Sequence, residues 1–426
     1  MPFDPPNSVA APLVLAPVLK PRRTLPPLQR QSEIVRPLST PEYYHSCVGR
    51  SPRTLEITRE NGFIFRGEGR ISAERWQAAL DQVTAVNPGL RLRLVGDGFR
   101  ARWLNDGQPT RLRIVEDCSW DARSSDGADF VYETVLSLND GLTSELLVMH
   151  QPNNRMLVML RGHHAVMDGK GAMHFMSELF HALRGEPLLG TNVAFSDVDV
   201  MMSVGAVRST SRHIKTVAMT GMPQGMARGD DWRLLDLGAP QKNMLGRIVE
   251  AMVEFTHQHS DLPVSIGVPV DLRRHVPGLI STANFTNMLL VRMEKGEGAE
   301  DFKRKLHEML DQKMETLYPS ILDIFKWLPL SWLDRLVSRN EKNYHQRKAL
   351  ETAVVSNLGR FNSVDFSCDG FRMDGMVVVP LTGSVFAGLA GVDDRVELAI
   401  NIPRVLSSNG RFDAFEAFLK KRLAGS

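Results

Sequence analysis

The stretch that decides the fold is residues 161–171, which read RGHHAVMDGKG. The residues before it, RMLVML (155–160), are apolar except for Arg155, which is typical of a strand buried on both faces. The residues after it, AMHFMSELFHAL (172–183), carry apolar side chains at helical spacing. The motif is therefore expected between a buried strand and the start of a helix.

Two adjacent histidines followed by an aspartate admit three interpretations. His163, His164 and Asp168 could bind a metal ion, but adjacent residues leaving a strand point to opposite sides, and no H-E-x-x-H motif or Cys/His cluster supplies further ligands. In a structural role, the imidazoles would bond backbone groups in a tight turn and Asp168 would cap the helix. In a catalytic role, a histidine at a rigid strand end would act as a base near neutral pH.

A cationic partner for Asp168 is expected at the end of another apolar strand. The stretch PVDLRRH (269–275) places Arg273 and Arg274 at such a position. Pairing with Arg273 would tie the histidine loop shut, and Arg274 is the alternative partner.

Length and composition limit the class of protein. The 426 residues suggest two domains of about 200 residues each. Basic and acidic side chains number 51 and 49, so no overall field draws the chain to nucleic acid. Three widely spaced cysteines favour neither a disulfide framework nor a metal motif, and a reducing cytoplasm is expected. No apolar run is long enough for a membrane span, and we expect no signal peptide.

The chain is expected to divide into four parts. Residues 1–35 are rich in proline without an apolar period, which predicts an extended leader. Residues 36–190 and 231–426 have mixed strand and helix patterns, which predict two α+β subdomains. Residues 191–230 have weak periodicity and are interpreted as the connection between them.

Several individual elements of the first subdomain are predicted. GFIFRG (62–67) has a strand pattern, and residues 73–86 have a helix pattern with Ser72 as its cap. Residues 90–115 contain three alternating stretches that predict an antiparallel meander, and residues 128–138 favour a helix. The stretch LYPSILDIFKWLPLSWLDRLV (317–337) is most simply a helix pair, broken at Pro329, that packs on the second subdomain, with an acyl channel or a membrane surface as alternatives.

A family resemblance joins these observations. His163 to Gly169 resembles the HHxxxDG signature of the chloramphenicol-acetyltransferase-like superfamily, which includes nonribosomal peptide condensation domains, polyketide-associated acyltransferases, wax ester synthases and plant BAHD acyltransferases. Further stretches that agree in order and spacing, within about residues 37–424, are NPGLRLRL (87–94), VPVDLRRH (268–275), ANFTNML (283–289) and VSNLGRF (355–361). The D-F-G-W-G motif of BAHD enzymes, the P-L-W-E motif of wax ester synthases and two condensation-domain motifs are absent, so the subfamily is unresolved.

The resemblance implies a fold and a reaction. Two chloramphenicol-acetyltransferase-like subdomains would form a pseudo-dimer with an active-site tunnel between them. His164 would be the general base that transfers an acyl group from a thioester to a hydroxyl or amine, without an acyl-enzyme. His163 would support the loop, Asp168 and Arg273 would fix it, and Gly169 would permit the turn.

Four polar residues are expected at the substrate, and Ser356 with Asn357 would donate to the tetrahedral oxyanion. The four are Ser356, Asn357, Asn284 and Asn287.

The resemblance also implies partners. The donor would be acyl-coenzyme A or an acyl or peptidyl carrier protein, the acceptor a small molecule, and the enzyme a cytoplasmic monomer with no tightly bound cofactor and no metal. Specialised-metabolite or lipid biosynthesis is the expected setting. The alternatives are a freestanding condensation enzyme that requires a carrier-bound donor, and a non-catalytic protein of the same fold that binds a carrier or partner.

Overall fold

The computed structural model describes residues 35–46, 60–191, 195–205, 208–209, 217–227, 229–333, 335, 351–379 and 384–424. The predicted leader lies almost wholly outside the described residues, and so does part of the predicted connection. Among the described residues, no helix is both long and apolar enough to cross a membrane.

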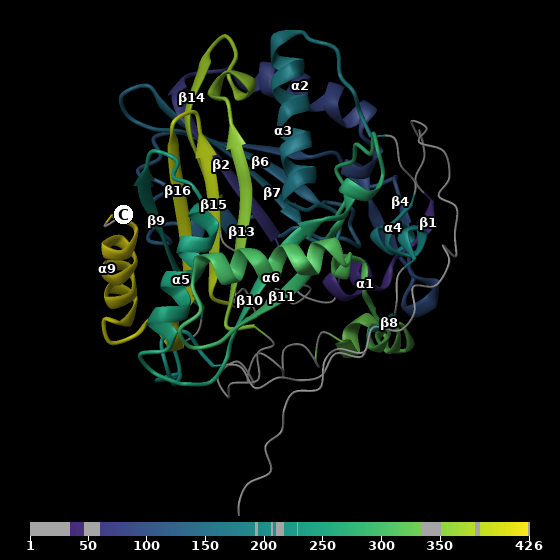
Figure 1. Cartoon of the computed structure of the whole chain (residues 1–426). Coiled ribbons are helices and arrows are strands. Elements are labelled where there is room, and N and C mark those ends of the chain that lie inside the picture. Colours follow the sequence, from purple (N-terminus) through teal and green to yellow (C-terminus); the bar gives the residue numbers. More distant parts are fainter. Residues whose placement is uncertain are drawn as a thin grey trace, which may run out of the picture.

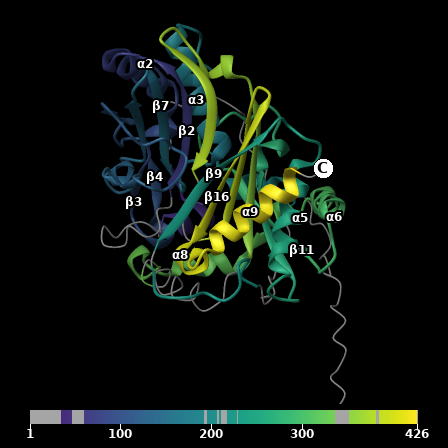
Figure 2. The same ribbon diagram turned by 90° about the vertical axis from the view of Figure 1, so that its left-hand side faces the viewer.

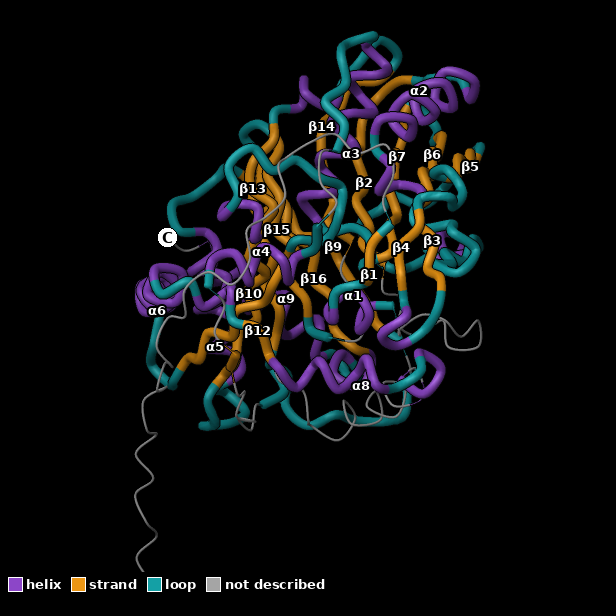
Figure 3. The backbone as a smooth tube through the Cα atoms, turned by 90° about the vertical axis from the view of Figure 1, so that its right-hand side faces the viewer, coloured by secondary structure: helices purple, strands orange, loops and turns teal. Residues whose placement is uncertain are grey.

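Two large sheets form the body of the protein (Figure 1, Figure 3). The five-stranded sheet has the order β14 (Phe371–Val379), β2 (Glu60–Gly69), β7 (Arg155–His163), β6 (Ser144–His150) and β5 (Arg111–Val115). The six-stranded sheet has the order β11 (Thr286–Met293), β10 (Val264–Asp271), β13 (Ala353–Phe361), β15 (Phe386–Val392), β16 (Arg395–Pro403) and β9 (Asp230–Gly238).

Two smaller sheets accompany them. One has the order β1 (Arg36–Pro37), β4 (Arg102–Leu104) and β3 (Arg93–Val95), and the other pairs β12 (Tyr318–Pro319) with β8 (Arg208–Ser209).

Helices cover the outer faces of the large sheets. The α-helices are α1 (Thr40–His45), α2 (Ala73–Val86), α3 (Gly169–Arg184), α4 (Asp197–Val204), α5 (Met244–Thr256), α6 (Ala299–Asp311), α8 (Arg404–Ser407) and α9 (Arg411–Ala424). The 3₁₀ helices are η1 (Pro88–Arg91), η2 (Gly98–Arg100), η3 (Asp129–Tyr132), η4 (Leu272–His275), η5 (Met314–Thr316), η6 (Ser320–Trp327) and η7 (Ser363–Phe366). Figure 2 shows α9 lying beside β9 and β16, where Arg233 of β9 pairs with Asp413 and Glu416.

Strand β14 couples the two parts of the chain. It lies late in the sequence, yet it pairs antiparallel with β2 at the edge of the five-stranded sheet. On the other side of this sheet, Ile64 and Met159 share a buried cluster with Leu234 of β9 and Ala399 of β16. The two sheets therefore share a core, and the division at residues 191–230 stays a prediction.

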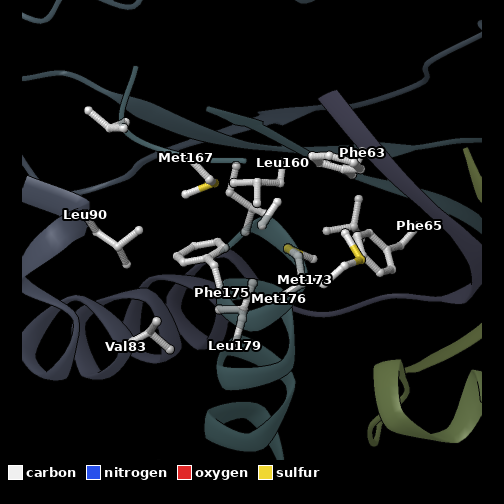
Figure 4. Packing of buried hydrophobic residues seen from close by; sticks show 14 of the residues in the cluster. Phe63, Phe65, Val83, Leu90, Leu160, Met167, Met173, Phe175, Met176 and Leu179 are labelled. Carbon is white, nitrogen blue, oxygen red and sulfur yellow. The ribbon is translucent and has the colours of Figure 1, made fainter. Parts of the chain in front are cut away.

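The core beneath the histidine motif is formed by α3 packing on β7 (Figure 4). Phe175, Met176 and Leu179 are fully buried because they recur at helical spacing on the face toward the sheet. Asp168 caps α3 by accepting from the Gly171 backbone N–H, and Gly185 ends the helix with a positive φ of 73°.

Several predicted elements are confirmed. Strand β2, helix α2 with Ser72 as its cap, and the β6–β7 hairpin all form. The hairpin turn contains Asn153 and Asn154 in the left-handed region, which asparagine tolerates better than most residues.

Other predicted elements are wrong. Strands β3 and β4 pair antiparallel, but β5 leaves the predicted meander and lies parallel to β6 in another sheet. Residues 128–138 form only the short 3₁₀ helix η3 (Asp129–Tyr132) instead of an α-helix, with Ala128 and Val131 buried in the cluster between the two sheets. The apolar segment 317–337 does not pack on the second part of the chain alone: Leu330 and Leu333 are buried in the cluster that contains Tyr43 and Trp103, and Trp327 and Trp332 are exposed.

Candidate active site

The candidate active site begins where strand β7 ends at His163 and the loop to α3 starts. Strand β7 lies between β2 and β6 and pairs with both along its length, so its end is held on two sides. His163 is buried, and its Nδ1 accepts a hydrogen bond of 3.1 Å from the Ala165 backbone N–H. His163 therefore packs behind the loop and braces the turn.

His164 is half-buried and points to a different set of groups. Its Nδ1 lies 3.1 Å from Asn61 Nδ2, 3.2 Å from Asn284 Nδ2 and 3.2 Å from the Met167 carbonyl oxygen. When Nδ1 carries the proton, it donates to the Met167 carbonyl and leaves Nε2 unprotonated, which is the form a general base requires.

Two asparagines hold the loop in this shape. Asn61 of β2 donates to the Met167 carbonyl at 2.6 Å, and Asn284 donates to the His164 carbonyl at 2.8 Å. Each amide thus bonds a loop carbonyl and also borders the His164 ring. Asn284 was predicted at the substrate, and the structure places it against the histidine. Asn61 was missed, because it lies about 100 residues upstream in a strand with no motif.

A third imidazole faces the site. The ring of His45, the last residue of α1, lies 4.6 Å from the ring of His164 between centroids, with an interplanar angle of 35°. Histidine 45 was also missed in the sequence analysis, because it follows the leader and belongs to none of the matched stretches.

Asp168 is the most heavily bonded group of the loop. It is 1% exposed and accepts from the backbone N–H groups of Gly171 and Phe285, both at 2.7 Å. It also accepts from Thr286 Oγ1 at 2.9 Å and from both terminal nitrogens of Arg273, at 2.9 and 3.1 Å. Burial raises the pKa of Asp168, but the charge and hydrogen bonds of Arg273 outweigh it, so the net pKa lies below its usual value.

Arg273 provides the other half of this ion pair. It follows strand β10 in η4, and its guanidinium also donates to the Asp271 carboxylate and to the carbonyls of Ser281 and Ala283. The alternative partner, Arg274, instead lies 3.8 Å from Glu315. The pair connects the histidine loop of the first part of the chain to the end of β10 in the second.

Glycines allow close approach on both sides of the loop. A Cβ added to Gly169 would lie 2.8 Å from Leu358 of β13, and one added to Gly171 would lie 2.2 Å from the Thr282 carbonyl oxygen. Packing against backbone therefore requires glycine at 171, whereas at 169 the Leu358 side chain is the group that would have to move. Gly169 is not among the residues with a positive φ, so its predicted role in the turn is better described as a role in packing.

The remaining predicted substrate residues lie in β13 and β11. Ser356 is half-buried, and the exposed Asn357 accepts from the Gly359 backbone N–H. Asn287 donates to the carbonyls of Glu315 and Leu317, at 2.7 and 3.2 Å, which anchors η5. A contact of these three with substrate stays a prediction. Within the described part of the chain, no group of three His, Cys, Asp or Glu residues is arranged to hold a metal ion.

Comparison with known proteins identifies the fold. No protein-family model matches the chain, and no curated protein matches its sequence. Among solved structures, it is similar to the first condensation domain of the calcium-dependent antibiotic synthetase, with 17% identity, a TM-score of 0.64, and 92% of this chain and 96% of that chain covered.

Two further structures agree. A variant of the starter condensation domain of rhizomide synthetase RzmA, in complex with C8-CoA and Leu-SNAC, has 15% identity and a TM-score of 0.62 over 92% of this chain and 94% of that one. Polyketide synthase associated protein 5 from Mycobacterium tuberculosis has 13% identity and a TM-score of 0.60 over 92% and 98%. The chain therefore has the chloramphenicol-acetyltransferase-like fold of condensation domains.

Proposed function

We propose that this protein is an acyltransferase that moves an acyl group from a thioester to a hydroxyl or amine, with His164 as the general base. The observation that carries the proposal is the environment of His164 Nδ1. A carbonyl acceptor lies 3.2 Å away on a loop whose shape is fixed by Asp168 and Arg273. In the tautomer in which Nδ1 donates to this carbonyl, Nε2 is the unprotonated nitrogen and can accept a proton from the acceptor.

The reaction balances with this one base. His164 Nε2 takes the proton from the acceptor as its oxygen or nitrogen attacks the thioester carbonyl, and the carbonyl oxygen becomes an oxyanion. Collapse of the tetrahedral intermediate breaks the carbon–sulfur bond, and the imidazolium returns the proton to the departing thiolate. Ser356 and Asn357 are the proposed donors to the oxyanion. No acyl-enzyme is required.

Coenzyme A thioesters are the proposed donors, and carrier-bound thioesters are the alternative. The RzmA domain was crystallised with C8-CoA, which supports a coenzyme A donor. Two of the three similar structures are condensation domains, which supports a carrier-bound donor. A non-catalytic binding protein is disfavoured, because the chain has both the candidate base and the Asp168–Arg273 ion pair that fixes its loop.

Intact mass spectrometry of products tests the proposal. The purified chain would be incubated with a panel of acyl-CoA thioesters of different lengths, or with acylated carrier proteins, and with a panel of small alcohols and amines. The expected result is an acceptor whose mass rises by the acyl group while free thiol appears in equal amount. Turnover with carrier-bound donors alone would favour the condensation enzyme, and no transfer from either kind of donor would contradict the proposal.

A further inference from the structure

Four exposed large apolar side chains lie in η2, in η6 and in the segment just after η6, and the proposed function does not use them. These are Trp327, Trp332, Phe99 and Ile324, which are 75%, 63%, 58% and 57% exposed. We name these four residues the aromatic surface.

The aromatic surface has a continuous centre. Residues three apart in a 3₁₀ helix lie one above the other, so Ile324 and Trp327 share a face of η6. The Phe99 ring of η2 packs edge-on against Trp327, with 4.9 Å between ring centroids and an interplanar angle of 79°. Two segments more than 200 residues apart therefore contribute to one exposed apolar area, which soluble proteins generally restrict.

Partly buried hydrogen bonds hold this surface in place. Asp97 Oδ1 accepts from Tyr43 Oη at 2.6 Å and from the backbone N–H of Leu330 at 2.8 Å, which joins η2 to the segment that carries the tryptophans. Tyr43 is fully buried and belongs to α1. The segments that carry the exposed rings are therefore fixed to helix α1 by hydrogen bonds.

Positive charge accompanies the exposed rings. Arg100 follows Phe99, Arg102 lies in the adjoining β4, and Arg335 lies one turn after Trp332. All three are exposed, and no ion pair joins any of them to another residue in the described part of the chain. Two carboxylates of these segments are engaged by hydrogen bonds: Asp97 as above, and Asp323 by Tyr318 and Thr40. A third, Asp334, lies outside the described residues.

Exposed tryptophan and phenylalanine side chains next to arginines match the chemistry of an anionic membrane surface. Indole rings partition into the headgroup region of a bilayer, and each arginine near an anionic leaflet strengthens binding by its charge. We propose that the aromatic surface docks on an anionic phospholipid membrane, which it contacts peripherally through Phe99, Ile324, Trp327 and Trp332 with Arg100, Arg102 and Arg335 at the headgroups.

This membrane-facing surface lies close to the candidate active site. Phe325 of η6 stacks on Tyr44 of α1 with 5.5 Å between centroids, and the next residue, His45, contacts His164. Helix α1 therefore contacts both η6, which carries part of the surface, and the candidate base. The docking proposal goes beyond the proposed function and does not depend on it.

Tryptophan fluorescence offers a direct test, because the chain has six tryptophans and only two are exposed. Trp76, Trp103, Trp120 and Trp232 are between 0% and 6% exposed, so a change of solvent at the surface reports on Trp327 and Trp332. Vesicles of phosphatidylcholine with about a third phosphatidylglycerol would be titrated into the full chain. The expected result is a blue shift that saturates with lipid and weakens as salt screens the charges.

Variants assign the binding to the named residues by vesicle co-sedimentation. Trp327→Ser should weaken binding ~10-fold or more, because a buried aromatic side chain is lost from the interface. Arg100→Gln and Arg335→Gln should each weaken it about fivefold, the change that corresponds to about 1 kcal/mol per charge. Val364→Ser, at a 70% exposed site on η7, is the matched control and should bind as the wild type does.

Three outcomes would overturn the docking proposal. The first is the absence of a blue shift with anionic vesicles. The second is equal binding to vesicles of phosphatidylcholine alone, which would remove the role of the arginines. The third is a blue shift that follows protein concentration without lipid, which would make a second copy of the chain the occupant.

Discussion

At the scale of single residues, His164 depends on partners that come from distant parts of the chain. Asn61, Asn284 and Met167 surround its Nδ1, and the His45 ring covers one of its faces. A flat ring packed against the imidazole restricts its rotation. His45 is thus expected to be a positioning residue for the base.

Replacing His45 separates this role from general packing. His45→Leu should lower kcat ~10-fold with little change in KM, because the base loses its orientation while substrate contacts remain. His45→Phe keeps a flat ring and should restore most of kcat. Tyr44→Leu is the matched control: it removes the stack on Phe325 and should lower the melting temperature while kcat stays within about threefold. A KM effect alone from His45→Leu would refute the positioning role.

At the scale of elements, the loop between β7 and α3 is held by one buried carboxylate. Asp168 caps α3 and also binds Arg273, Phe285 and Thr286 from the second part of the chain. Removing one partner of a buried pair leaves the other charge uncompensated, which costs about 3–5 kcal/mol. The loop that aims His164 therefore depends on an ion pair between two distant segments.

A double-mutant cycle tests this ion pair. Asp168→Asn and Arg273→Leu should each lower the melting temperature and the rate together, and the double variant should lose less than the sum of the singles, with a coupling of about 0.5–3 kcal/mol. Strictly additive losses would show that the two residues do not interact.

The pH dependence of stability provides a second readout of Asp168. Its pKa is below the ordinary value in the folded protein, so its contribution to stability is complete above the ordinary carboxyl pKa and is lost as pH falls through the folded pKa. The difference in unfolding free energy between wild type and Asp168→Asn should therefore shrink as pH falls below about 4. A difference that is constant down to pH 2 would contradict the assignment.

At the scale of the whole molecule, the two large sheets are interdependent. Strand β14 comes from the last sixty residues, yet it covers the edge of β2, and Arg66 of β2 pairs with Glu397 of β16 across the shared core. An uncovered β2 would expose a hydrogen-bonding edge and the apolar side chains beneath it.

Dividing the chain tests this interdependence. Residues 1–230 expressed alone should be insoluble or lack cooperative unfolding, and co-expression with residues 231–426 should restore a soluble complex. Thermal unfolding of the full chain should follow a single transition. A soluble fragment 1–230 with its own sharp transition would show that β14 is dispensable.

The sequence predicted the parts of this structure that depend on local pattern. Strand β7 and helix α3 follow from apolar spacing, and a partner for Asp168 at residue 273 or 274 follows from the end of another apolar strand. The choice of Arg273 and the fold follow from the resemblance. Local spacing does not encode pairings between distant segments. Such pairings determine that β5 lies parallel to β6, that β14 crosses to β2, and that Asn61 and His45 contact His164. The exposure of Trp327 could not be predicted either, because an apolar pattern does not distinguish a core face from a docking face.

The central claim is that His164 acts as the general base of a direct acyl transfer. The most direct test is the single-turnover rate of acyl transfer by wild type, His164→Ala and His163→Ala, with the intact mass of each enzyme recorded during the reaction. We predict that His164→Ala folds normally and loses about 10²–10⁴-fold in rate, that His163→Ala loses less, and that no enzyme gains the mass of the acyl group. Wild-type turnover by His164→Ala, or an acylated enzyme on the reaction path, would contradict the account.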